Sequence, residues 1–204
     1  MKKTKQLIHE LKHHAPFTLI ATVLGIIIVL FIKYILALSF EQEAFEILHP
    51  IHIIASAAVS AGIFYKYKKS ITPALIVGIF SAILIGSLSD IILPYLGGIS
   101  FGLQTNFHLP IIEKPLMILS SAIIGSLIGI STKLTKLPHL LHVAISIFAS
   151  LFYLLAFSTN FNPLIFILAT IIVFIAVLIP CCISDILLPF FFLGKSIKQC
   201  SCKH

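Results

Sequence analysis

Residues 137–184 form a long uncharged stretch in the second half of the chain: LPHLLHVAISIFASLFYLLAFSTNFNPLIFILATIIVFIAVLIPCCIS. These 48 residues include no Asp, Glu, Lys or Arg. A run of about 20 uncharged residues is long enough to cross the hydrocarbon core of a bilayer as a helix. Polar residues and Pro163 mark a turn near Asn160, so the stretch predicts two membrane-spanning helices.

The composition extends this interpretation to the whole chain. Of the 204 residues 59% are hydrophobic and 10% are charged, and the mean hydropathy is +1.12. Soluble domains have roughly 45–50% apolar and about 25% charged residues, so a soluble protein is excluded. We predict an all-α, polytopic membrane protein with six transmembrane helices. Their approximate positions are 15–38, 49–66, 71–95, 113–132, 138–157 and 162–193.

The lysines predict the orientation. The net charge is +7, but the chain has no Arg and its Lys residues lie in small groups between apolar runs, which argues against a nucleic-acid partner. Twelve of the 14 lysines fall on one side of a six-helix chain. Because positively charged loops stay inside, we expect a multi-pass protein of the plasma membrane with both termini in the cytoplasm.

The chain contains an internal repeat. The segment from Ser89 to Pro94, SDIILP, matches the segment from Ser184 to Pro189, SDILLP, at five of six positions. Each follows a His pair of equal spacing: His49 and His52 in the first half, His139 and His142 in the second. Three helices per copy place the second copy upside down in the membrane, which is the inverted-repeat plan of many transporters.

This repeat predicts the domain organisation. We expect a cytoplasmic amphipathic segment, a first three-helix repeat, an outer connection, a second three-helix repeat and a cytoplasmic Cys/His tail. Their ranges are 1–14, 15–98, 99–112, 113–194 and 195–204.

The polar residues of the two repeats predict two clusters at opposite faces of the bilayer. The outer cluster would consist of His49, His52, Asp90 and Glu113, and the inner cluster of His139, His142, Asp185 and His14. Imidazoles three residues apart share a helical face, and with a carboxylate they suit Zn, Mn, Fe, Co or Ni. The alternative is that these His residues lie in the headgroup region and bind water.

The Ser-Asp segments supply further candidate groups. A Pro four residues after each Asp lacks the N–H that would bind the Asp carbonyl, so Pro94 and Pro189 would each free a main-chain oxygen. The hydroxyls of Ser89 and Ser184 and the thiols of Cys181 and Cys182 lie nearby in the sequence. The alternative is that each Asp stabilises a packing joint between helices.

Together these features favour a permease that carries a divalent transition-metal cation by alternating access between the two clusters. The alternatives are a membrane-embedded, metal-dependent hydrolase and a non-transporting accessory subunit of a larger permease. We expect the bilayer and the metal ion as partners, a homodimer because six helices are few for a transport path, and no tightly bound cofactor.

The motifs His49-Pro50-Ile51-His52 and Ser-Asp-x-x-x-Pro are similar to motifs of known membrane proteins. The chain resembles a group of small prokaryotic multi-pass membrane proteins with the same His-Pro-x-His and Ser-Asp signatures, over most of its length. The resemblance implies the same arrangement of spans, and it implies no substrate.

Overall fold

The computed structural model describes residues 2–36, 41–132, 137–158 and 162–193. Within these ranges it describes no side chains at 2–11, 13, 14, 137–140, 169 and 181–193. The described chain is almost entirely helical, and its one β-type contact is an isolated antiparallel bridge between Thr105 and Ser158. The predicted all-α class is therefore confirmed.

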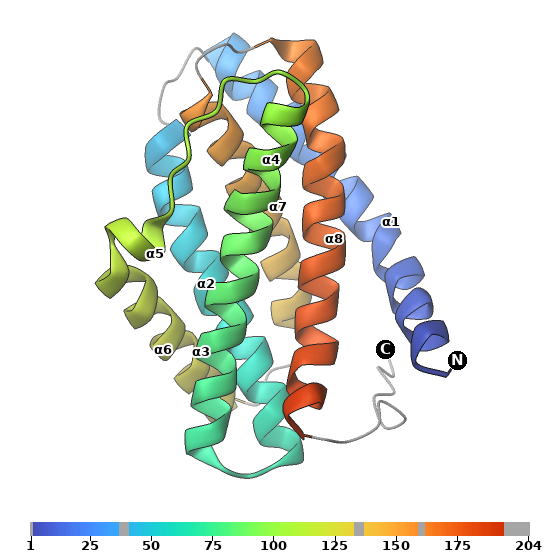
Figure 1. Cartoon of the computed structure of the whole chain (residues 1–204), viewed down its shortest axis with the longest axis vertical. Coiled ribbons are helices and arrows are strands. Elements are labelled where there is room, and N and C mark those ends of the chain that lie inside the picture. The colour runs from blue at the N-terminus through green and yellow to red at the C-terminus, as the bar shows by residue number, and fades with distance from the viewer. Residues whose placement is uncertain (1, 37–40, 133–136, 159–161, 194–204) are drawn as a thin grey trace.

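The helices form an elongated bundle (Figure 1). In that view α1, α3 with α4, and α7 run upward, while α2, α6 and α8 run downward. The elements are α1 (Lys2–Phe31), η1 (Ile32–Leu36), α2 (Glu41–Tyr67), α3 (Ile71–Ser87), η2 (Leu88–Ile92), α4 (Leu93–Ser100), α5 (Pro110–Glu113), α6 (Pro115–Thr132), α7 (Leu137–Phe157) and α8 (Pro163–Leu193). The elements η1 and η2 are single π-helical turns.

Five helical segments of the described chain are long and apolar enough to cross a bilayer. They are Ala15–Leu36, Glu41–Tyr67, Ile71–Ser100, Pro115–Thr132 and Pro163–Pro180. The part of α7 with described side chains, Leu141–Phe157, is a shorter apolar helix. Large apolar side chains such as Leu19, Ile76 and Leu116 point outward from the bundle, as expected of a protein solvated by lipid.

The helix α2 begins earlier than the predicted span. Glu41 and Glu43 lie in its first turn, where acidic side chains interact favourably with the helix dipole. Pro50 therefore lies inside the helix, and the two histidines beside it are buried in the bundle instead of opening the span at its outer end. This corrects the predicted position of the first His pair.

Small residues let α2 pack closely against α6. A side-chain Cβ at Gly125 would collide with the main chain at Ile54, and one at Gly129 would collide with the main chain at Ala58. Two glycines four residues apart are a common means of bringing membrane helices together. The close contact fixes α2, and with it the two histidines that α2 carries.

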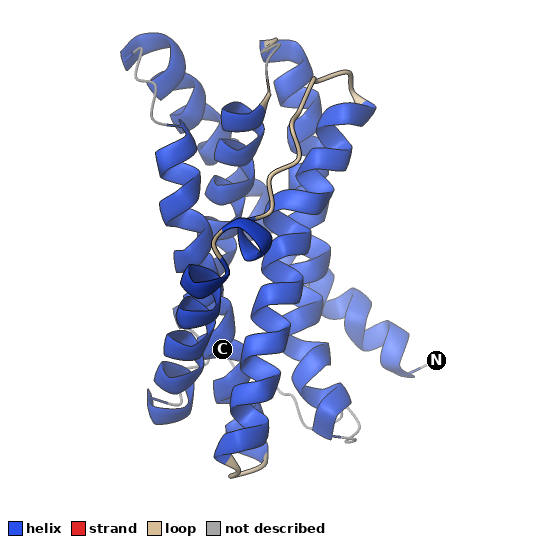
Figure 2. Ribbon diagram, turned by 60° about the vertical axis from the view of Figure 1, so that its left-hand side comes forward, coloured by secondary structure: helices blue, strands red, loops and turns tan. Residues whose placement is uncertain are grey.

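The connection between α4 and α5 folds back along the bundle (Figure 2). The main-chain N–H of Asn106 donates to the carbonyl of Phe157, and the hydroxyl of Tyr153 donates to the carbonyl of Asn106. The N–H of His108 in turn donates to the hydroxyl of Tyr153. These bonds hold the connection against the end of α7.

Candidate functional site

The candidate site is built around the carboxylate of Asp90, which is fully buried in the apolar segment Ile71–Ser100. Asp90 lies in the π-helical turn η2, where the N–H of Leu93 donates to the carbonyl of Leu88, five residues earlier. Single π-helical turns inside α-helices occur frequently at functional sites. An ionised carboxylate at membrane depth costs at least about 2.5–3.5 kcal/mol, so its surroundings have to compensate.

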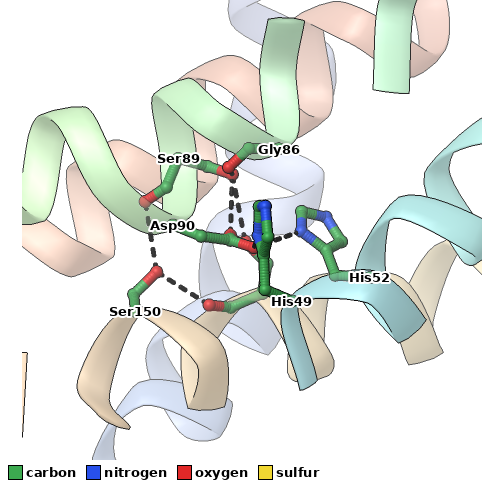
Figure 3. Close-up of polar contacts among 7 residues, drawn as sticks. His49, His52, Gly86, Ser89, Asp90 and Ser150 are labelled. Atoms are coloured by element: carbon green, nitrogen blue, oxygen red, sulfur yellow. Dashed lines mark hydrogen bonds and ion pairs between the residues drawn. The ribbon is translucent and has the colours of Figure 1, made fainter. Parts of the chain in front are cut away.

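Four donors surround this carboxylate, and Figure 3 labels His49, His52 and Ser89 among them. The Nδ1 atoms of His49 and His52 lie 2.9 Å and 2.7 Å from its Oδ2. The hydroxyls of Ser89 and Ser146 donate to its Oδ1 at 2.9 Å and 2.6 Å. These side chains come from α2, η2 and α7, so one acidic group joins three segments that are far apart in the sequence.

A main-chain oxygen beside Asp90 also receives a side-chain donor. In the π-helical register the carbonyl of Ser89 would bind the N–H of residue 94, but Pro94 has none. The hydroxyl of Ser150 lies 3.1 Å from this carbonyl and 2.7 Å from the carbonyl of Ser146 on its own helix, so its one proton can be shared between the two oxygens. The prediction assigned a freed carbonyl to Asp90 itself, because it assumed α-helical spacing. With π-helical spacing, the carbonyl that faces Pro94 is that of Ser89.

The hydrogen bonds fix the tautomers of the two histidines. An ionised Asp90 accepts hydrogen bonds only, so both Nδ1 atoms carry a proton when they bind it. The two Nε2 atoms are buried and have no hydrogen-bond partner among the described residues. With both imidazoles neutral the centre has a net charge of −1. One additional proton on either ring would neutralise it.

A third histidine adjoins the centre. The rings of His52 and His142 are nearly parallel, 5° apart, and their centroids are separated by 5.3 Å. His142 is fully buried on α7, and α7 packs along α2. The prediction assigned His142 to a separate cluster at the opposite face of the membrane. The structure instead places it against His52, at the contact between α2 and α7.

Aromatic side chains cover His49 on the side of α5. The ring of Phe45 stacks on that of His49 at 5.5 Å and 17°, and Tyr153 packs edge-on against Phe45. Phe157 contacts both Phe45 and the ring of His108. Phe45 and Tyr153 have no solvent-exposed surface, so an apolar layer separates the centre from the polar groups at the α5 end of the bundle.

Glu113 is not part of the centre. Its carboxylate pairs with Nδ1 of His108 at 2.8 Å, and its side chain is 47% exposed. The short helix α5 holds it at the surface of the bundle, where water can solvate its charge. The predicted outer cluster therefore retains His49, His52 and Asp90, and it loses its fourth member.

Several predicted site residues lie outside the described side chains. They are His14, His139, Cys181, Cys182, Ser184, Asp185 and Pro189. The Cys/His tail, residues 195–204, also lies outside the described residues. The inner cluster thus has one described member, His142.

The described residues contain no group of three His, Cys, Asp or Glu side chains arranged to hold a metal ion. The oxygens of Asp90 already accept four hydrogen bonds, so this carboxylate orients the imidazoles instead of supplying a free ligand. The groups that remain available to a cation or a proton are the Nε2 atoms of His49 and His52.

Sequence reasoning missed Ser146 and Ser150, although the sequence carries a signal for them. The pattern His-x-x-His-x-x-x-Ser-x-x-x-Ser occurs twice, at residues 49–60 and at residues 139–150. Extending the comparison of the two His pairs by two helical turns would have identified both serines as repeated features.

Comparisons with known proteins add no assignment. No family model, no curated protein and no solved structure matches the chain.

Proposed function

We propose that the chain is an integral membrane permease that exchanges a divalent transition-metal cation for a proton at His49, His52 and Asp90. The observation that carries the proposal is the state of the two imidazoles. Both are oriented by one carboxylate through Nδ1, and both keep a buried Nε2 with no partner among the described residues.

This arrangement is the one found around metal ions in proteins. A histidine that binds a metal through one nitrogen usually donates its other N–H to a carboxylate, which fixes the tautomer and increases the basicity of the ligand. Two imidazole ligands are fewer than a tight structural site uses. Weak coordination suits a cargo, because a transported ion has to leave the site again.

The charge of the centre supports exchange with a proton. With Asp90 ionised, one protonated imidazole makes the empty centre neutral, and the proton then occupies a nitrogen that the metal needs. Metal binding to histidine therefore releases protons and weakens as the pH falls. A centre that holds either ion, but not both, couples the movement of one to that of the other.

The packing of the helices supports an inverted repeat, with α1, α2 and α3–η2–α4 corresponding to α6, α7 and α8. The helix α1 packs on α7 and α8, and its counterpart α6 packs on α2 and α3. The contacts of α2 with α3 and of α7 with α8 are likewise equivalent, and α2 and α7 pack on each other. Equivalent histidines, His52 and His142, stack at this central contact.

In this proposal the second repeat supplies a second group of ligands, with His139, His142, Asp185 and His14 as its candidates. Both termini lie in the cytoplasm, on the side of the clustered lysines. The layer formed by Phe45, Tyr153 and Phe157 closes the centre at one end, so opening this layer would be one half of the transport cycle.

Reconstituted protein tests the proposal. Liposomes that contain the purified chain, a zinc-sensitive dye and a pH-sensitive dye are exposed to external Zn²⁺. We expect Zn²⁺ to enter while protons leave, and we expect Asp90→Asn to reduce both rates at least tenfold. Glu113→Gln, which removes a surface carboxylate, should leave them within twofold. Zinc entry that is equal in the wild type and Asp90→Asn would refute the proposal.

A further inference from the structure

The connection between α4 and α5, residues 101–109, is held between these helices and the end of α7. It leaves α4 through a turn at Gly102, whose φ of +85° favours glycine, and it runs down the bundle to α5 (Figure 2). A side-chain Cβ at Gly98 of α4 would lie only 2.8 Å from Oγ1 of Thr105, so the connection packs closely on α4. On its other side Thr105 forms the isolated bridge with Ser158, and their hydroxyl oxygens lie 3.0 Å apart.

The hydroxyl of Tyr153 joins this connection to the aromatic layer. It donates to the carbonyl of Asn106 at 3.2 Å, and it accepts the N–H of His108 at 3.3 Å. The ring of Tyr153 has no exposed surface and belongs to the layer itself. Both hydrogen bonds are longer than is usual for such groups, so a modest free energy releases them.

The side chain of His108 lies on the layer from the side of the connection. Its ring stacks on that of Phe157 at 4.4 Å and 18°, and it meets the ring of Phe45 edge-on at 6.0 Å. Phe45 in turn stacks on His49. Because Phe45 is fully buried, it can leave the ring of His49 only when its neighbours move.

The connection is better suited to move than the helices around it. Only Leu103 and Thr105 of its residues are buried, and most of the others, such as Gln104 and Phe107, are exposed. Segments with few buried contacts open at a lower free energy than the packed elements of the same protein.

We propose that residues 101–109 form the gate of the centre. When the hydroxyl of Tyr153 releases the two main-chain groups it binds, the connection moves away from the layer with His108, and Phe45 is then free to uncover His49. This inference rests on the proposed function, because a transported cation needs an entrance that opens and closes again.

Modification of His49 by diethyl pyrocarbonate, mapped by mass spectrometry, reports whether the gate opens. Tyr153→Phe keeps the ring in the layer and removes both bonds of the hydroxyl, so labelling of His49 should increase about fivefold. Tyr95→Phe is the matched control, because Tyr95 packs on Phe107 of the connection through its ring and makes neither of these bonds. The control should leave labelling within about twofold, and equal labelling of Tyr153→Phe and the wild type would overturn the inference.

A disulfide bond tests the opposite change. Thr105→Cys and Ser158→Cys are introduced together into a chain whose four native cysteines are replaced by serine. Residues paired in an antiparallel bridge lie at a separation that a disulfide can span. The oxidised chain should label at His49 about fivefold more slowly than the same chain after reduction, and its zinc entry into liposomes should fall about tenfold and recover on reduction. Labelling of His49 that is the same before and after reduction would reject the gate.

The two readouts separate this inference from the proposed function. A disulfide that slows the labelling of His49 in a chain without zinc flux would establish the gate and reject transport. Zinc exchange that continues unchanged in the oxidised chain would reject the gate and retain transport at Asp90.

Discussion

The most informative experiment compares two substitutions of Asp90. Alanine removes the carboxylate, and asparagine replaces it with an amide of nearly the same shape and serves as the control. Asp90→Ala deletes the acceptor of four hydrogen bonds. Asp90→Asn keeps an acceptor oxygen for the imidazoles, and its amide group can donate to the serine hydroxyls after they rotate. The first change should therefore destabilise the bundle far more than the second.

The stability lost in Asp90→Ala depends on which hydrogen-bond donors keep another acceptor once the carboxylate is removed. Ser146 retains the hydroxyl of Ser89 at 3.3 Å, so it stays hydrogen-bonded. His49 and His52 lose the only partners of their Nδ1 atoms among the described residues. Each buried donor left without an acceptor costs about 1–3 kcal/mol. Asp90→Ala should therefore lower the free energy of unfolding by roughly 2–6 kcal/mol.

Reversible unfolding in mixed micelles, followed by circular dichroism, measures this difference. Asp90→Asn should cost less than half as much as Asp90→Ala. Glu113→Ala removes a partly exposed ion pair and should change stability by at most about 1 kcal/mol. If Asp90→Ala were as stable as the wild type, the carboxylate would not be the group that holds α2, η2 and α7 together.

Three further predictions concern the surroundings of the centre. Ser150→Ala should lower the free energy of unfolding by about 1–2 kcal/mol. Adding Pro94→Ala should recover part of this loss, because it restores a main-chain N–H for the carbonyl of Ser89. A double variant whose losses are only additive would count against this. Gly129→Val should force α6 away from α2 and lower stability by at least about 1–3 kcal/mol, whereas an unchanged unfolding curve would contradict the close helix contact. Phe45→Ala should expose His49 to diethyl pyrocarbonate, so mass spectrometry should detect a modification that is slow in the wild type, and equal labelling of both proteins would show that the aromatic layer is no barrier.

Much of the fold could be predicted from the sequence, because lipid leaves few alternatives to long apolar helices. The ends of α6, α7 and α8 fall close to the predicted spans, since charged or helix-breaking residues border each of them. The start of α2 could not be predicted in the same way. Glu41 and Glu43 precede the predicted span 49–66, but they lie in the first turn of the helix.

The centre was predictable only in part. A His pair on one helix and an Asp on the next indicated that His49, His52 and Asp90 belong together, and they do share a hydrogen-bonded cluster. Its depth was not predictable, because it depends on where α2 begins. The role of the carboxylate also differed: Asp90 holds the imidazoles instead of standing free as a ligand.

Two predicted positions were wrong because the depth of a residue in the membrane was inferred from its distance along the sequence to the end of its helix. Glu113 was expected beside Asp90, but it lies on α5, where it is partly exposed and pairs with His108. His142 was expected at the far side of the bilayer, but α7 packs antiparallel to α2 and brings it against His52. Such placements depend on how helices slide along one another, and a single sequence does not encode that offset in any local pattern.

Calorimetric titration of the purified chain with Zn²⁺, in two buffers of different ionisation enthalpy, measures whether the cation displaces a proton from the two imidazoles. The proposal predicts binding that releases protons, and it predicts that His49→Gln combined with His52→Gln removes this component while any binding elsewhere on the chain persists. Identical heats and identical proton release in the wild type and the double variant would contradict the assignment of the two Nε2 atoms as the cation site.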